Sequence, residues 1–191
     1  MAKVSADLKQ ALEKLPQADL LKIIVRFASA YEEMNEILEY EICRSDSEED
    51  LFDDACADIA GEFGFYHGRI IQKELAQSIS KSIAIINRFK KIVKKPYLET
   101  KLIRHLLEIV FESHTKDLGT CWTVFDSKVI TTTKRFFTLV FKLHEDYRYE
   151  FIDPFNKFLK ILKKECSDCD SVYALPSDYL EYEKMKSALS F

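Results

Sequence analysis

The sequence of 191 residues contains only four glycines and four prolines. Ordinary proteins contain about 7% glycine and about 5% proline. The shortage leaves few positions where the backbone can take a positive φ angle without strain, and it argues against a glycine-rich loop that cradles phosphates. The chain also lacks G-x-S-x-G, Walker and H-E-x-x-H motifs, so no catalytic residue is assigned from the sequence.

Long apolar segments are absent as well. The longest uninterrupted apolar runs are about four residues, as in 83–86, whereas a membrane-spanning helix needs about 20. The first ten residues lack the apolar stretch of a signal peptide. The five cysteines are an odd number scattered along the chain, which is typical of reduced thiols in a cytoplasmic protein. We therefore expect a cytoplasmic chain without a membrane partner.

The residues that are abundant predict an all-α fold. Hydrophobic residues make up 47% of the chain and the net charge is only −4, which excludes a disordered chain and supports a sizeable core. Apolar residues recur every three or four positions through most of the sequence, as on amphipathic helices. The predicted helices cover about 5–15, 16–43, 48–63, 69–94, 97–116, 121–146, 153–164 and 177–188.

Short connections between these helices favour an antiparallel bundle, or an irregular α-α array, of about six to eight helices without a sheet. We expect one domain over residues 1–191, with a weak subdivision allowed at the glycine-rich turn 61–68. The helix at 97–116 is apolar on two faces, which predicts a central position. The segment 129–133 is β-branched and resembles a strand, but the apolar stripe around it favours a helix.

Charge is unevenly distributed. Residues 32–62 carry 13 acidic and one basic group, whereas residues 63–104 carry two acidic and ten basic groups. We favour the interpretation that the acidic helices pack beside the basic one, since sequential helices are usually neighbours. The alternative is a basic binding surface for nucleic acid or an acidic partner, formed by Lys90, Lys91, Lys94, Lys95, Lys101 and Arg104. The overall negative charge argues against nucleic acid.

Cys166 and Cys169 form the one spacing that is typical of metal or redox sites. A single C-x-x-C supplies two ligands, whereas structural zinc needs four. The other ligands would have to come from Cys43, Cys56, Cys121 or a histidine. Zinc is thus a candidate cofactor, and loop cysteines without a metal are the alternative.

Three histidines are the remaining candidates for a functional site, and none of them is joined by spacing to a catalytic partner. His105 and His114 are nine residues apart on one predicted helix and therefore lie on different faces. His67 follows Tyr66 in the glycine-rich turn and is the histidine most typical of a site, although no base or nucleophile is tied to it by spacing.

Three stretches, residues 12–23, 85–92 and 102–119, resemble a Bacteroidetes-type bacterial family of small helical proteins with a domain of unknown function. This resemblance implies an all-α cytoplasmic protein and carries over no activity and no catalytic residue.

The sequence therefore favours a helical interaction or scaffold module that binds another protein or a second copy of itself. A metal-binding protein that uses Cys166 and Cys169 is one alternative. Nucleic-acid binding through the basic segment 88–104 is the other.

Overall fold

The structure is a computed structural model that describes residues 4–43, 47–64, 66, 70–120, 123–166, 170–173 and 175–188. All regular elements in these ranges are helical, which confirms the predicted all-α class. The chain divides into two compact units, Met1–Ser47 and Glu48–Phe191, called here the N-terminal unit and the body. The boundary follows Ser47, and the glycine-rich turn 61–68 falls inside the body.

The N-terminal unit contains α1 (Ala6–Glu13), α2 (Gln17–Ala30), α3 (Glu32–Leu38) and a π-helical turn, η1 (Glu39–Cys43). The prediction of one helix over 16–43 is wrong, because Tyr31 is extended (φ −132°, ψ 107°) and separates α2 from α3. Glu32 and Glu33 begin the new helix, where negative charge interacts favourably with the helix dipole. Ser5 caps α1 as expected, since its hydroxyl accepts the Leu8 N–H at 3.2 Å.

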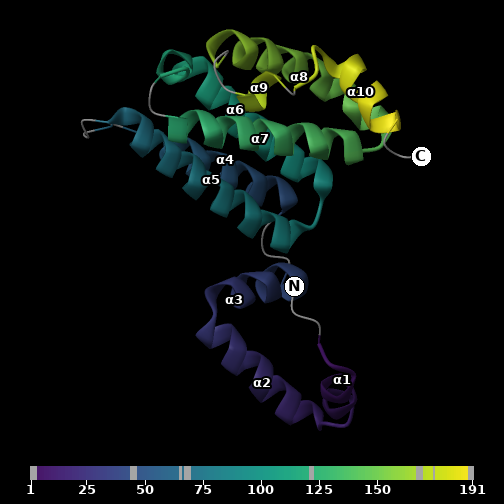
Figure 1. Ribbon diagram of the computed structural model, residues 1–191. Coiled ribbons are helices and arrows are strands. Elements are labelled where there is room, and N and C mark those ends of the chain that lie inside the picture. The colour runs from purple at the N-terminus through teal and green to yellow at the C-terminus, as the bar shows by residue number, and fades with distance from the viewer. Residues whose placement is uncertain are drawn as a thin grey trace. The chain divides into compact units, whose positions relative to one another are not determined.

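The body is built in three layers (Figure 1). Helices α4 (Glu48–Gly61) and α5 (Ile71–Val93) form the first layer, and α6 (Pro96–Ser113) and α7 (Thr123–Lys142) form the second. The third holds α8 (Glu145–Glu165), against which α9 (Asp170–Tyr173) and α10 (Tyr179–Ala188) pack. A 3₁₀ turn, η2 (Thr115–Asp117), follows α6. Single-turn α9 and the break at Tyr31 raise the number of helical segments above the expected six to eight.

Helix α6 is central to the body, as its two apolar faces predict. It contacts α4, α5, α7 and α8. Six of its apolar side chains are at most 4% exposed: Leu102, Ile103, Leu106, Leu107, Val110 and Phe111. Helix α6 therefore contributes to the packing of all three layers, because it contacts at least one helix in each.

Phenylalanines fill the space between α7 and α8. Phe137 stacks on Phe155 with 3.8 Å between ring centroids, and Phe136 meets Phe158 edge-on at 5.6 Å. Phe111 of α6 stacks on Phe158 at 5.0 Å, so the aromatic cluster links the second and third layers. Such ring pairs contribute about 0.5–1.5 kcal/mol each beyond the apolar area that they bury.

The β-branched segment of α7 is helical, as predicted. Thr131, Thr132 and Thr133 each donate their hydroxyl to the carbonyl four residues earlier, at 2.7–2.8 Å. This local bond satisfies the hydroxyl of Thr133, which is fully buried. The apolar stripe of α7 therefore overrides the strand preference of its threonines.

The predicted start of a helix at Asp153 and Pro154 is wrong. Pro154 lies inside α8, which begins at Glu145 with His144 as its N-cap, and α7 ends at Lys142 rather than 146. A proline inside a helix costs about 3 kcal/mol, because one backbone hydrogen bond is lost and the ring crowds the preceding turn. The buried stripe of Phe151, Phe155, Phe158, Leu159 and Leu162 offsets that cost, since its continuity requires one uninterrupted helix.

Gly119, in the turn between η2 and α7, lies very close to the C-terminal end of α8 in the third layer. Its φ is +67°, and a Cβ built there would lie 2.0 Å from the Glu165 carbonyl oxygen. Only glycine fits this combination of backbone angle and distance.

Replacing Gly119 with alanine should destabilise the body by about 2–4 kcal/mol, from left-handed strain and overpacking together. The matched control is Gly61→Ala at the end of α4, where nothing lies within 4 Å of the new Cβ. Thermal melting should show a fall on the order of 5–15 °C for Gly119→Ala and no fall for Gly61→Ala. Equal melting temperatures for the two variants would contradict this account of Gly119.

Candidate functional site

One residue of the basic segment, Lys90, contacts a buried carboxylate. Glu99, in the first turn of α6, is 2% exposed. Its carboxylate accepts hydrogen bonds from Lys90 of α5 at 3.0 Å and from Arg135 of α7 at 2.9 Å. Arg135 also donates to the Asn87 side-chain oxygen at 2.8 Å, so one polar cluster joins three helices. We call Glu99, Lys90, Arg135 and Asn87 the Glu99 cluster.

Three further members of the predicted basic surface also have partners within the body. Lys95 forms an ion pair with Glu48 of α4. The Lys101 ammonium lies 5.3 Å from the Phe52 ring centroid and 5.6 Å from that of Tyr97. Arg104 pairs with Glu108 at 2.8 Å and lies 3.5 Å from a Glu150 carboxylate oxygen.

The last two members, Lys91 and Lys94, are exposed at the C-terminal end of α5. Lys94 is the C-cap of that helix and has a positive φ of 54°, a conformation that usually favours glycine. As the C-cap, it carries a positive charge at the end of the helix where the dipole is negative.

Within the body these contacts support one part of that interpretation, in which the acidic helix α4 packs beside the basic helices α5 and α6. The other acidic stretch, 32–43, belongs to the N-terminal unit. Glu48 and Glu62, near the two ends of α4, pair with Lys95 and Lys81, the latter at 2.9 Å. The basic residues thus neutralise carboxylates of the same chain. Most of these pairs are exposed and contribute about 0–1 kcal/mol each, whereas the Glu99 carboxylate is deeply buried.

The cysteines are not gathered in the described part of the chain. Cys166 is the C-cap of α8 and is 1% exposed, and Cys169 lies outside the described residues. Burial, followed by the negative charge of Asp53, raises the pKa of the Cys56 thiol to about 11, so this thiol stays protonated at neutral pH. In the residues that the structure describes, three or more metal-ligating side chains do not come together.

His114 occupies a small aromatic cluster at the C-terminal end of α6. Its Nδ1 lies 3.5 Å from an Asp117 carboxylate oxygen, and its ring contacts Phe63 and Tyr66. Burial raises the pKa of Tyr66. This cluster fixes the segment after α4 against the end of α6. His67, the other histidine of interest, lies outside the described residues.

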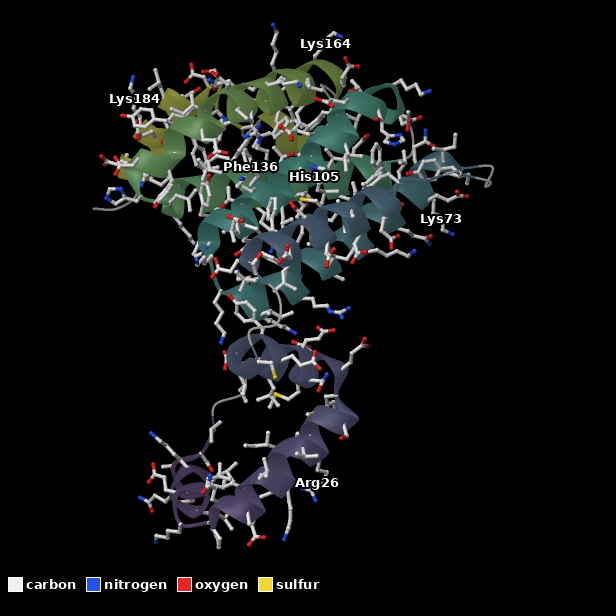
Figure 2. All side chains as sticks on the ribbon, turned by 180° about the vertical axis from the view of Figure 1, so that it is seen from behind. Arg26, Lys73, His105, Phe136, Lys164 and Lys184 are labelled. Carbon is white, nitrogen blue, oxygen red and sulfur yellow. The ribbon has the colours of Figure 1, made fainter. Side chains whose placement is uncertain are left out.

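His105 and Asp126 each have a buried polar atom without a partner among the described residues: Nε2 of His105 and Oδ2 of Asp126. Figure 2 shows His105 among the helices of the body, with Lys164 and Lys184 at its rim. Oδ1 of Asp126 accepts the Gly119 N–H at 3.2 Å, which joins the Gly119 turn to α7. Burial raises the pKa of Asp126, and the Gly119 hydrogen bond opposes that shift.

The N-terminal unit has a different character from the body. None of the residues in its helices is buried. Six apolar residues of α2 form what we call the α2 face: Leu20, Leu21, Ile23, Ile24, Val25 and Phe27. Leu21 is 60% exposed and Val25 is 55% exposed. The periodicity of the sequence marks Leu20, Ile24 and Phe27 as one stripe, but not Leu21, Ile23 or Val25, and it does not show how far this face is exposed.

No protein-family model, curated protein sequence or solved structure matches this chain. The resemblance to a Bacteroidetes-type family stays a prediction. Among the described residues, no helix is long and apolar enough to span a membrane.

Neutralising Glu99 should destabilise the body, because Arg135 and Lys90 would lose their shared carboxylate. We expect Glu99→Gln to lower the free energy of unfolding by about 1–3 kcal/mol, the range for hydrogen bonds to charged groups. Glu108→Gln is the control, since it removes a partly exposed pair on the same helix and should cost about 0.5 kcal/mol or less. Denaturant unfolding measures both values, and a larger effect at Glu108 would contradict the assignment.

The raised pKa of Asp126 predicts a pH-dependent stability. The folded state retains the carboxyl proton over a pH range in which the unfolded chain, with the ordinary value of 3.8, has lost it. The contribution of Asp126 to stability therefore decreases as the pH rises above about 4, and Asp126→Asn removes that contribution. Melting curves should show the variant gaining on the wild type as pH rises. The exposed Asp153→Asn variant should show no such gain, and parallel behaviour of the two variants would contradict the prediction.

Proposed function

We propose that this protein is a protein-interaction module in which the body is a stable helical scaffold and the N-terminal unit carries the docking surface. The single observation that carries the proposal is that the helices of the N-terminal unit bury none of their side chains, although α2 is strongly apolar. Short helices in water are only marginally stable without a tertiary contact on their apolar face. A partner that covers the α2 face would supply that contact.

The exposed apolar residues of the body have a different distribution. Among its described residues, the body has at most two exposed large apolar residues on any one helix, such as Tyr147 and Tyr149 on α8. Exposed apolar residues that are scattered in this way over different helices are ordinary on protein surfaces. On α2, by contrast, several such residues share one helix at helical spacing, which is typical of a docking helix.

Charge also favours a docking role over a purely solvated face. The charged residues of α2 are Asp19, Lys22 and Arg26, and Lys22 pairs with Asp19 at 3.0 Å. By helical position they lie opposite the α2 face, but the Arg26 guanidinium lies 5.7 Å from the ring centroid of Phe27, at one edge of that face. The rest of the α2 face can enter an apolar interface without burying a charge, which would be costly. Zinc binding and nucleic-acid binding remain predictions for which the described contacts add no support.

A photo-crosslinking amino acid at Leu21, in cells that make this protein, tests the proposal. It should give a discrete adduct with protein, because position 21 lies on the α2 face. Ser29 is the control position, since it is exposed on the charged side of the same helix and should give little adduct. The body should melt at an unchanged temperature in both variants.

Three outcomes would overturn the docking role. The first is the absence of a discrete adduct from position 21. The second is an equal yield of adducts from positions 21 and 29, which would indicate contact without a defined face. The third is crosslinking of position 21 to lipid, or to residues 48–191 of its own chain, in place of a partner protein.

A further inference from the structure

We infer that the partner of the N-terminal unit is a second copy of this chain, docked through the α2 face in a two-fold dimer. This inference rests on the proposed docking function and names its occupant.

The α2 face is wider than one covering helix requires. At 100° per residue, its six members span about 200° of the helix circumference, from Ile23 to Val25. A surface helix that packs on one neighbour needs an apolar arc of about 100°. Within its own unit α2 contacts chiefly α3. About half of the arc is therefore available to a second helical surface.

The remaining side of α2 carries all of its charges. Asp19, Lys22 and Arg26 fall within about 60° of one another. Arg26 reaches the Phe27 edge of the α2 face, where its guanidinium lies 5.7 Å from the ring centroid, so two α2 faces that meet away from this edge place no like charges opposite each other. The apolar arc offers no complementary charge by which a differently charged protein would be selected.

The exposed apolar area of the whole N-terminal unit, summed over α2 and its flanking segments, is of the size that one partner contributes to a dimer interface. Nine large apolar residues of the N-terminal unit are 40–70% exposed: Val4, Leu8, Leu21, Ile24, Val25, Phe27, Tyr31, Met34 and Ile42. Four of them lie on α2 and the other five on the flanking segments of the unit. At roughly 200 Å² per large side chain the unit as a whole presents on the order of 900 Å² of apolar surface. A standard interface takes about 800 Å² from each partner. A small peptide would leave much of this surface in water, whereas an identical unit covers a surface of its own size.

A two-fold dimer would cover the α2 face of both copies in a single interface. In such a dimer the same patch on both copies forms the interface, so no apolar surface is left to recruit a third chain. Because α2 and α3 contact each other within one copy, two copies bring four helices around one apolar centre.

Sedimentation equilibrium of the purified full chain tests the inference over about 1 µM to 1 mM, the span of moderate affinities. The wild type should move from one chain mass to two as concentration rises. Ile24→Glu should weaken the dimer at least tenfold, because it places a charge inside the apolar interface. Ser29→Glu adds the same charge on the opposite side of α2 and should change the dissociation constant less than threefold.

Folding of the variants does not confound the comparison. Ile24 is 41% exposed and belongs to a helix without buried residues, so both variants should keep the melting temperature of the body. A photo-crosslinker at Leu21 in the purified wild-type chain gives a second readout, an adduct of twice the chain mass.

The outcomes separate the two proposals. A purified chain that stays monomeric throughout, or a dimer weakened equally by Ile24→Glu and Ser29→Glu, overturns the second-copy inference. If the cellular adduct from Leu21 then contains a different protein, the docking function stands with another partner. If no cellular adduct forms, the docking function itself fails.

Discussion

Burial of α6 on several sides at once is the constraint on which the body depends. The helix carries apolar residues on two faces, and each neighbour in the body, α4, α5, α7 and α8, contacts it. Phe111 extends its apolar surface into the aromatic cluster between α7 and α8, where it stacks on Phe158. Glu99 brings the same helix a buried carboxylate, which must be met by cations from α5 and α7. The position of α6 thus determines both the apolar and the polar contacts of its neighbours.

The polar and apolar parts of this arrangement differ in what they contribute. Burial of apolar side chains is non-directional and supplies most of the stabilisation. The Glu99 cluster is directional, because one carboxylate has to receive Lys90 and Arg135 at hydrogen-bond distance. Breaking such a pair is costly, whereas replacing the whole cluster by apolar groups need not be. The cluster therefore favours one alignment of α5, α6 and α7 over other packings of similar apolar area.

The sequence predicted the fold class and the central helix because both depend on local periodicity. It also resolved the β-branched segment of α7, since the stripe around Thr133 outweighed its strand preference. It failed at Tyr31 and Pro154, where the outcome depends on what the flanking helices pack against rather than on the residue itself. Glu99 and Arg135 are 36 positions apart, so no local pattern joins them. The stripe on α2 looks the same in sequence whether its own unit or another protein covers it.

Lys94 shows how scarce glycine is compensated in this chain. The residue ends α5 in a left-handed conformation that costs a side-chain-bearing residue about 1–2 kcal/mol relative to glycine. A cation at the end of a helix recovers about 0.3–1 kcal/mol, and Lys90 and Lys91 lie in the same last turn. The backbone at this corner is therefore held in a strained geometry that electrostatics partly relieves. High ionic strength screens this interaction between the lysines and the helix dipole, so the turn between α5 and α6 becomes less stable as the salt concentration rises.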